Sequence, residues 1–169
     1  MLDSYYRAFI AEQRYLMYLD GLKMTLLVSL LAIILGVALG TILALMRMTA
    51  ERRGKSTLLS KIAYVYIDII RGTPTVTQLL IMYFVVLKGV DGLIVGTVTF
   101  GLNSAAYVAE IIRAGILAVD HGQMEGGRSL GLSYGQTMKD IILPQAVKNI
   151  LPALGNEFIV LIKETAILG

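Results

Sequence analysis

The sequence predicts an all-α membrane protein, because its composition, its apolar runs and its sparse charges all depart from those of soluble domains. Of the 169 residues, 56% are hydrophobic and 16% are charged, against roughly 45 to 50% and about 25% in soluble proteins. The mean hydropathy is +0.73. Several apolar runs approach the roughly 20 residues that a helix needs to cross a bilayer. We therefore expect a single transmembrane domain over residues 1–169, with four visible membrane-spanning helices.

Catalytic and metal chemistry find no support in the sequence. The chain lacks cysteine, which excludes disulfides and thiolate metal sites, and it has one histidine, His121. No metal-ligand spacing and no activated serine arrangement is visible. The net charge of +3 does not indicate nucleic-acid binding. We expect a protein that is not an enzyme and that holds no cofactor or metal of its own.

The chain opens with a mixed segment and a long apolar run. Residues 1–21 combine aromatic and charged side chains, which favours an external amphipathic helix at the headgroup level, with a solvated tail as the alternative. Residues 22–46 carry one charge, Lys23, and predict the first span. Gly36 and Gly40 form a GxxxG pattern that lets another helix approach closely, although glycine is also common in membrane helices generally.

A basic segment follows the first span and predicts the orientation of the chain. Five basic residues stand within fifteen positions against the single acid Glu51, namely Arg47, Arg52, Arg53, Lys55 and Lys61. Such clusters lie on the cytoplasmic side, so the N-terminus is expected outside. The Gly54-Lys55-Ser56 stretch is not a nucleotide-binding P-loop, because Thr49 stands where that motif needs its first glycine.

The second apolar run, residues 62–87, predicts a membrane helix that is interrupted. Pro74 removes a helix hydrogen bond and should kink or break the helix there. Asp68 and Arg71 lie three residues apart within the same run. Ionisable groups at membrane depth face an interior or a wet cavity, so the two side chains either pair with each other or line a pathway.

The third run, residues 93–119, follows an outer turn at 88–92 and carries polar side chains near its middle. These are Asn103, Ser104, Tyr107 and Glu110. Positions 103, 107 and 110 share one helix face. Because a polar stripe toward lipid is costly, we expect it to face other helices or a passage, with interhelical hydrogen bonding as the simpler alternative.

A polar interval at residues 120–146 separates the third run from the fourth, and we expect it to be a cytoplasmic loop. Gly131 should divide it into two short helices, at 124–130 and 133–143. The second should start at a capping box formed by Ser133 and Gln136.

We expect Pro144 to end the second short helix of this loop. We also expect Met138, Ile141 and Ile142 to form an exposed apolar edge that suits a protein partner.

The fourth predicted span covers residues 147–169 and contains acidic groups. Glu157 and Glu164 lie seven residues apart and so share one helix face. If these helices line a passage, acids at several depths favour a solute that carries a cationic group.

Four stretches carry a resemblance to a known family. The residues Glu125-Gly126-Gly127, Gly131 and Ile141-Ile142-Leu143-Pro144 are similar to the EAA loop of the membrane permease subunits of bacterial ABC importers. The stretches RGTP at 71–74, LNSAAYVAEIIRAGI at 102–116 and LPALGNEFIVLIKETAI at 151–167 resemble the polar amino-acid uptake branch. The resemblance covers nearly all of residues 22–169.

This resemblance implies a transport role in the bacterial inner membrane with defined partners. Two permease subunits, alike or different, form the translocation pathway for a polar or basic amino acid, and an external solute-binding protein delivers it. The EAA loop docks on an ATP-binding subunit, where ATP and Mg²⁺ are expected. Implied coupling residues are Glu125, Gly126, Gly127, Arg128, Leu130, Gly131, Met138, Ile142 and Pro144. Candidate pathway residues are Asp68, Asn103, Ser104, Tyr107, Glu110, Glu157 and Glu164.

The chain departs from the family pattern in two respects. Gly126 and Gly127 stand where the family usually has alanines, and each glycine in a helix costs about 1 kcal/mol relative to alanine. The first short helix is therefore expected to be short or to depend on its partner for order. The second departure is length: members of this branch normally continue into one more membrane helix, and we expect that fifth span to be missing here.

Two other readings stay open on the sequence. A self-sufficient channel or secondary transporter would use the intramembrane acid–base pairs as an ion or proton route. An incomplete, nonfunctional fragment is the other, since the fifth span is not visible.

Overall fold

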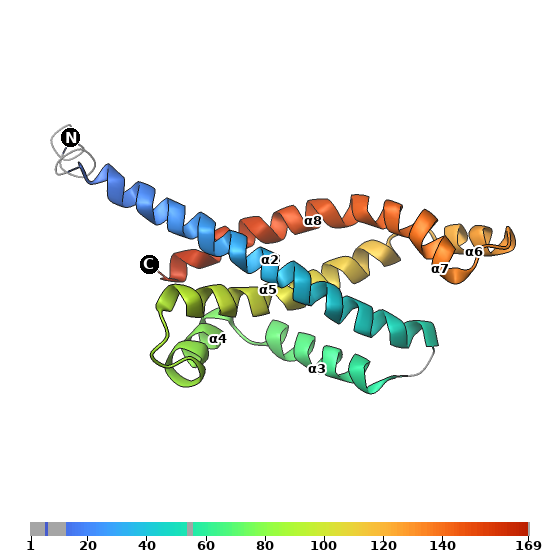
Figure 1. Ribbon diagram of the computed structural model, residues 1–169, viewed down its shortest axis with the longest axis horizontal. Coiled ribbons are helices and arrows are strands. Elements are labelled where there is room, and N and C mark those ends of the chain that lie inside the picture. The colour runs from blue at the N-terminus through green and yellow to red at the C-terminus, as the bar shows by residue number, and fades with distance from the viewer. Residues whose placement is uncertain (1–5, 7–12, 54–55, 169) are drawn as a thin grey trace.

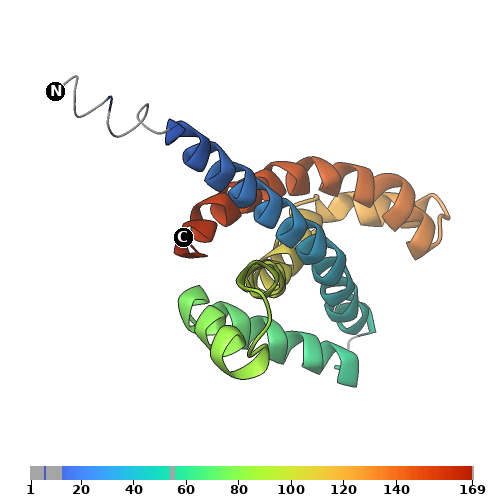
Figure 2. The same cartoon turned by 60° about the vertical axis from the view of Figure 1, so that its left-hand side comes forward.

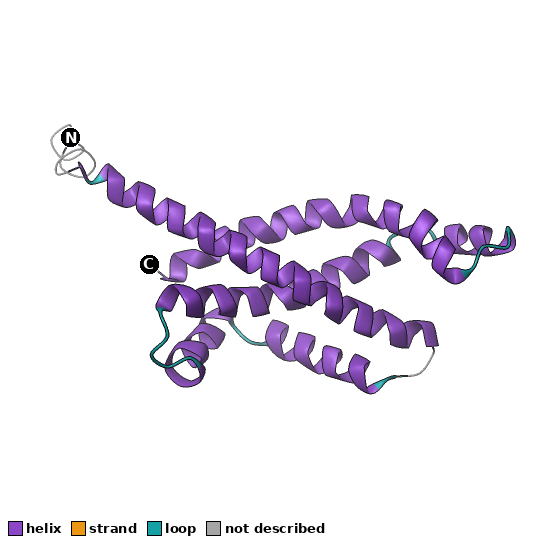
Figure 3. Cartoon of the chain, viewed as in Figure 1, coloured by secondary structure: helices purple, strands orange, loops and turns teal. Residues whose placement is uncertain are grey.

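The computed structural model describes residues 6, 13–53 and 56–168, and these residues form helices with no strand (Figures 1 and 3). The all-α prediction is therefore confirmed. In chain order the elements are α2 (Tyr15–Arg53), α3 (Leu58–Gly72), α4 (Thr75–Ile81), the π-helical turn η3 (Met82–Val86), α5 (Gly92–Leu117), α6 (His121–Ser129), α7 (Tyr134–Thr137), the π-helical turn η4 (Met138–Ile142), α8 (Leu143–Glu164) and the 3₁₀ turn η5 (Thr165–Leu168).

Helix α5 is the central element of the fold. In the apolar stretch of α5, 61% of the residues are buried inside the chain, against 28% of those in the apolar stretch of α2. In Figure 2 the other long helices surround α5. One apolar cluster joins α2, α5 and α8 through Val28, Phe100 and Leu161. A second cluster joins α2, α3 and α5 through Ala44, Ile67 and Ala106.

The GxxxG pattern lies where α2 crosses α5. A Cβ atom at Gly36 would stand 2.8 Å from Ser104 Oγ, and one at Gly40 would stand 2.8 Å from the carbonyl oxygen of Ala105. These separations leave no room for a larger residue. The prediction that the two glycines permit close helix approach is therefore confirmed, with α5 as the partner helix.

The predicted second span is broken. Helices α3 and α4 meet at a bend of 105°. Thr73 caps the end of α3, and Pro74 is the residue from which α4 starts. The interruption that Pro74 predicted is confirmed.

Among the described residues, two helices are long and apolar enough to cross a membrane, Tyr15–Thr49 and Gly92–Leu117. A third span results if the bent α3–α4 pair counts as one. These helices match three of the four predicted spans. The fourth, within α8, is a helix as expected but does not pass this test, because Gln145, Lys148 and Glu157 lower its apolar character. Exposed apolar side chains such as Leu45, Val65 and Phe84 cover the outer faces of the bundle, and such faces need lipid or another subunit.

The end of α2, the start of α3 and the α6–α7 region all lie at one end of the elongated molecule (Figures 1 and 2). The start of α2 and the end of α8 lie toward the other end. This arrangement agrees with the expectation that the basic segment and the polar interval share one side of the membrane. Of the predicted N-terminal segment 1–21, residues 15–21 belong to α2, whereas 1–5 and 7–12 are outside the described residues.

Candidate functional site

The loop between α5 and α8 folds into two short helices, as the sequence predicted. Asp120 caps α6, because its Oδ1 accepts the backbone N–H of Gly122 at 2.6 Å. Gly131 adopts φ +85°, a left-handed conformation that favours glycine and reverses the chain after α6. Arg128 Nη1 donates to the carbonyl oxygen of Leu132 at 2.9 Å and holds this turn.

The second short helix begins at the predicted capping box. The Ser133 backbone N–H donates to Gln136 Oε1 at 2.8 Å, and the Gln136 backbone N–H donates to Ser133 Oγ at 3.3 Å. Pro144 does not end this helix, so that prediction was wrong. The π-helical turn η4 brings the Leu143 N–H to the carbonyl of Met138, and the helix then continues with Pro144 in the first turn of α8, where proline is tolerated.

The apolar side chains of the second short helix face inward, which corrects the predicted exposed edge. Ile142 is 4% exposed, and Met138 and Ile141 are half-buried. They are covered because η4 packs against α6 and the start of α8. These three side chains therefore contact other parts of the same chain and do not form the exposed apolar edge that the sequence predicted.

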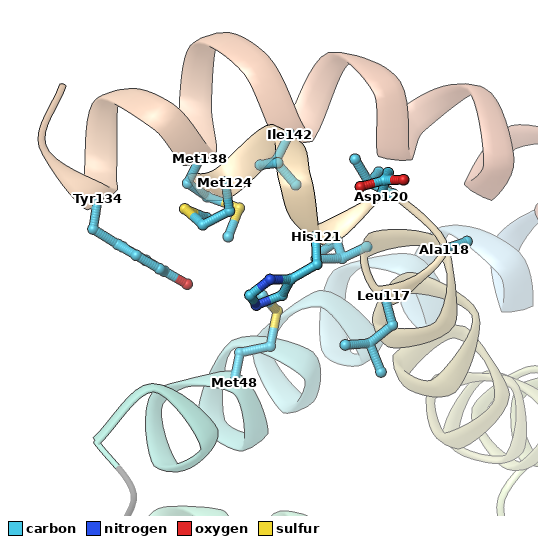
Figure 4. A pocket seen from close by; sticks show the side chains of 11 residues that line it. Met48, Leu117, Ala118, Asp120, His121, Met124, Tyr134, Met138 and Ile142 are labelled. Atoms are coloured by element: carbon cyan, nitrogen blue, oxygen red, sulfur yellow. The ribbon is translucent and has the colours of Figure 1, made fainter. Parts of the chain in front are cut away.

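A cavity of about 610 Å³ lies between the loop and the neighbouring ends of α2 and α5. Figure 4 shows Met124, Tyr134 and Met138 of the loop around the same space as Met48 of α2 and His121 of α6. This cavity separates the loop from the end of α2.

The two glycines of α6 differ in their surroundings. A Cβ atom at Gly127 would stand 2.5 Å from Cγ2 of the fully buried Thr137, whereas a Cβ atom at Gly126 would meet no atom within 4 Å. Gly127 therefore allows α6 and α7 to pack closely. The first short helix forms across His121–Ser129 despite both glycines.

The outer face of the loop carries charge and one apolar side chain. Glu125 is exposed and pairs with the exposed His121 at 3.1 Å. Arg128 and Gly126 are also exposed. Leu130, at the turn between the short helices, is 83% exposed. This combination of a protruding leucine and flanking charges suits a protein surface better than water.

A buried ion pair joins α2 to α5 near the loop. Arg47, expected in the basic segment, is 7% exposed and pairs with Glu110. Arg113 Nη1 lies 3.8 Å from the other oxygen of Glu110. The Arg47 guanidinium also stacks 4.1 Å from the ring centroid of Tyr64 on α3. Sequence reasoning missed this role of Arg47, because its partners lie on two other helices.

Asp68 and Arg71 do not form an ion pair with each other in the described part of the chain. Arg71 instead lies 5.3 Å from the ring centroid of Tyr107 on α5, a cation–π geometry. Asp68 is exposed. The pairing alternative is therefore wrong, and Asp68 lies apart from the other polar residues of the interior.

Two of the remaining predicted pathway residues, Asn103 and Glu164, contact residues that follow the break between α3 and α4. Asn103 donates to Gln78 Oε1 at 3.0 Å, and Glu164 accepts from Thr75 Oγ1 at 3.4 Å. Ser104 is fully buried close to Glu157, although its Oγ does not reach hydrogen-bond geometry. The polar stripe of α5 thus faces other helices, as expected.

Sequence reasoning missed Thr75 and Gln78, although both are polar residues in an apolar run directly after Pro74. Within the described residues, no three His, Asp or Glu side chains gather where they could hold a metal ion.

This fold and loop define a membrane component of an importer. Residues 36–169 match the family described as "Binding-protein-dependent transport system inner membrane component", and the chain belongs to that family. It is 47% identical over 153 residues to the "Arginine transport system permease protein ArtQ" of Bacillus subtilis (strain 168), covering 88% of this chain and 68% of that protein. It is 46% identical over 158 residues to the "Putative glutamine transport system permease protein GlnP" of Rickettsia bellii (strain RML369-C), covering 91% and 70%.

Solved structures agree with this assignment. One described as "Crystal structure of an amino acid ABC transporter with histidines" superposes with a TM-score of 0.84 at 45% identity, over 95% of this chain and 74% of that one. The MetNI methionine ABC transporter in an inward-facing conformation superposes with a TM-score of 0.76 at 19% identity, over 94% and 76%, and supports the fold alone. The chain is therefore a permease subunit of the ABC-importer type, and neither a self-sufficient channel nor a secondary transporter is favoured.

Proposed function

We propose that this chain is the permease subunit of an ATP-driven importer for a polar amino acid. The observation that carries the proposal is its similarity, over about nine tenths of its length, to permeases named for arginine and glutamine transport. In this proposal a second permease subunit completes the pathway, and an external solute-binding protein delivers the amino acid. ATP and Mg²⁺ bind the ATP-binding subunit, and this chain has no ATPase site of its own.

The loop at residues 120–146 is the proposed docking element for the ATP-binding subunit. Its outer face presents Glu125, Arg128 and Leu130, while Gly127 and Ile142 hold its two short helices together from within. The inward-facing residues Met138 and Ile142 thus act in coupling by keeping the loop rigid.

The loop is connected directly to two long helices, which supports a lever mechanism. Helix α5 ends at Leu117 and α6 begins at His121, while η4 runs without interruption into α8 at Leu143. A rigid-body displacement of the docked loop would therefore move α5 and α8 together. Closure of the ATP-binding subunits would in this way change the pathway between the helices.

The acidic groups beside the α3–α4 break favour a basic amino acid within the polar class. Glu157 and Glu164 are seven residues apart on α8 and so share one helix face, and Thr75 Oγ1 donates to Glu164 just after the break. A cationic substrate group would offset two neighbouring carboxylates. We assign three of the other predicted pathway residues to the walls of the same passage, namely Asn103, Ser104 and Tyr107. Glu110 is instead paired with Arg47, and Asp68 is exposed on α3.

The proposed location is the inner membrane with several crossings and the N-terminus outside. The support for the orientation is the basic segment around Arg52 and Lys61, because basic loops stay in the cytoplasm. The docking loop lies at the same end of the molecule (Figure 1), where a cytoplasmic ATP-binding subunit could reach it.

Copurification with the ATP-binding subunit tests the docking assignment. Glu125→Lys should abolish copurification and uptake while leaving membrane insertion intact, since it reverses a charge on the exposed face of α6. The matched control is Asp20→Lys, which makes the same charge change at an exposed position in the first turns of α2, outside the docking loop, and should leave copurification unchanged. Unchanged complex formation and uptake in Glu125→Lys would refute this docking face.

A further inference from the structure

The break between α3 and α4 leaves backbone carbonyls that the helix can no longer satisfy. In a continuous helix the carbonyl of Ile70 would accept the N–H of residue 74, but that residue is Pro74 and has no N–H. The surroundings are apolar, with Ile69, Ile81 and Leu102 lining the adjacent cavity of about 250 Å³. An unsatisfied carbonyl in such a place is strongly unfavourable.

The side chain of Gln78 supplies the missing donors. Its Nε2 donates to the carbonyl oxygen of Ile70 at 2.7 Å and to that of Thr73 at 3.1 Å. It also lies 2.7 Å from Thr73 Oγ1, which itself donates to the carbonyl of Ile69 at 2.9 Å. Two amide hydrogens thus serve three acceptors. Gln78, with the hydroxyl of Thr73, which also lies 3.4 Å from the carbonyl oxygen of Ile70, therefore satisfies the end of α3.

The other end of the same amide is held by the central helix. Gln78 Oε1 accepts a hydrogen bond from Asn103 Nδ2 at 3.0 Å, and Asn103 is 3% exposed on α5. The orientation of the Gln78 amide is determined by chemistry, because two of the acceptors around Nε2 are carbonyls and cannot donate. Gln78 is thus bonded to α3, to the break and to α5 at once.

We propose that Gln78 is the positioning residue that sets the bend between α3 and α4, with Asn103 as its anchor on α5. Pro74 explains why the helix breaks, but the lost hydrogen bond alone does not select one angle. The Gln78 amide selects it by joining both sides of the break to a third helix. The bend in turn places Thr75 beside Glu164 on α8, so Gln78 organises the polar passage without contacting substrate.

Spin-label distances test this proposal directly, because the chain has no native cysteine. Cysteine pairs at Val65 with Leu80, and at Leu80 with Ile94, use exposed positions on α3, α4 and α5. The first pair reports the bend, and the second reports the register of α4 on α5. Labelled chains are measured within the complete transporter in lipid nanodiscs.

Gln78→Leu removes both the donor to the end of α3 and the acceptor for Asn103. In both cysteine pairs the distance between the spin labels should change from a single narrow peak to a broad distribution. Gln78→Glu keeps an acceptor for Asn103 but loses the donor, so it should broaden the 65–80 distance more than the 80–94 distance. Asn103→Leu removes the anchor on α5, so it should broaden the 80–94 distance more than the 65–80 distance. The matched control is Thr41→Val, which removes a hydroxyl bonded within its own helix to the carbonyl of Val37 and should leave both distances narrow.

Narrow, unshifted distances in both Gln78→Leu and Gln78→Glu would overturn the proposal. If Gln78→Leu fails to assemble, the near-isosteric Gln78→Glu and Asn103→Leu decide it on the same two distances. Uptake of radiolabelled arginine and glutamine is measured in parallel. We expect uptake to be lost in Gln78→Leu and retained in Thr41→Val, and this expectation rests on the proposed function. Absence of uptake in the unmodified transporter would refute the proposed function, whereas the distances test the bend independently.

Discussion

Among single residues, Arg47 is a charged side chain that the sequence assigned to a basic loop but that is buried between helices. It contacts Glu110 on α5 and Tyr64 on α3 while it is itself part of α2. A guanidinium can pair with a carboxylate and stack on a ring at the same time. Arg47 therefore ties three helices together at the end of the molecule that carries the proposed docking loop.

Removal of Arg47 should destabilise the protein more than removal of an exposed basic residue. Arg47→Met leaves Glu110 without its main partner. Removing one partner of a buried ion pair lowers the free energy of unfolding by about 3 to 5 kcal/mol. We expect about 3 kcal/mol here, because Arg113 remains close to Glu110. The matched control is Lys61→Met, at an exposed position of α3, for which a change within about 0.5 kcal/mol is expected. Thermal or denaturant unfolding in detergent measures the difference.

The double variant Arg47→Met with Glu110→Leu separates the stabilisation from the ion pair itself from the cost of leaving one buried charge unpaired. Replacing both charges by apolar groups should recover part of the lost stability, because no unpaired charge is then buried. Equal stability of Arg47→Met and Lys61→Met would contradict the structural role of Arg47.

At the scale of elements, α6 illustrates two glycines with opposite reasons to be present. Gly127 lies against Thr137 of α7, and a side chain there would displace a fully buried residue. Gly126 has open space around it. The proposed docking helix therefore needs Gly127 for packing within the chain, whereas no atom of the chain itself requires a glycine at position 126.

Alanine substitution should distinguish the two glycines. Gly126→Ala should stabilise α6 by about 0.5 to 1 kcal/mol, because alanine loses less backbone entropy in a helix. Gly127→Ala should destabilise the loop by about 1 to 3 kcal/mol through overpacking. Hydrogen exchange of the α6 amides in the complete transporter measures both effects. Changes of the same sign in the two variants would show that Thr137 moves aside and that the close contact is not required.

At the scale of the whole molecule, the polar groups are ordered along the bundle. The Arg47–Glu110 pair lies between α2 and α5 toward the docking loop, and Arg71 lies beside Tyr107 on α5. The Gln78, Thr75 and Glu164 contacts follow at the α3–α4 break. A substrate entering at the break would lie beside Glu164 before it reaches the Arg47–Glu110 ion pair.

Competition experiments test the substrate class that this order favours. In reconstituted transporter with its solute-binding protein, unlabelled arginine should reduce uptake of the labelled substrate more than glutamate does, because the carboxylates repel an acidic side chain. Glu164→Gln should weaken the preference for arginine relative to glutamine. The control Asp140→Asn removes a carboxylate from the exposed loop and should leave the preference unchanged. Stronger competition by glutamate than by arginine would exclude a basic substrate.

Much of the fold could be predicted from local patterns. The apolar runs located α2 and α5, Pro74 located the break, and Ser133 with Gln136 located the start of α7. These features depend on side chains within a few residues of one another, where periodicity and capping act directly. The inward orientation of Ile142 and the passage of the helix through Pro144 could not be predicted in this way, since both depend on how η4 packs against α6 and α8.

Composition and hydrophobic period along the chain were enough to predict the membrane class and the positions of the long helices. Pro74 was enough to predict the broken span, and the motifs of the loop at 120–146 carried the family resemblance. Which polar groups meet follows from the packing of the helices. Arg47 joins Glu110, and Gln78 joins Asn103, across helices that are distant in sequence. Polar side chains at membrane depth are favoured beside other polar groups, but the partner that each one meets depends on helix crossings. The crossing of α2 on α5 that Gly36 and Gly40 permit brings Arg47 to Glu110, and the bend at Pro74 brings Gln78 to Asn103.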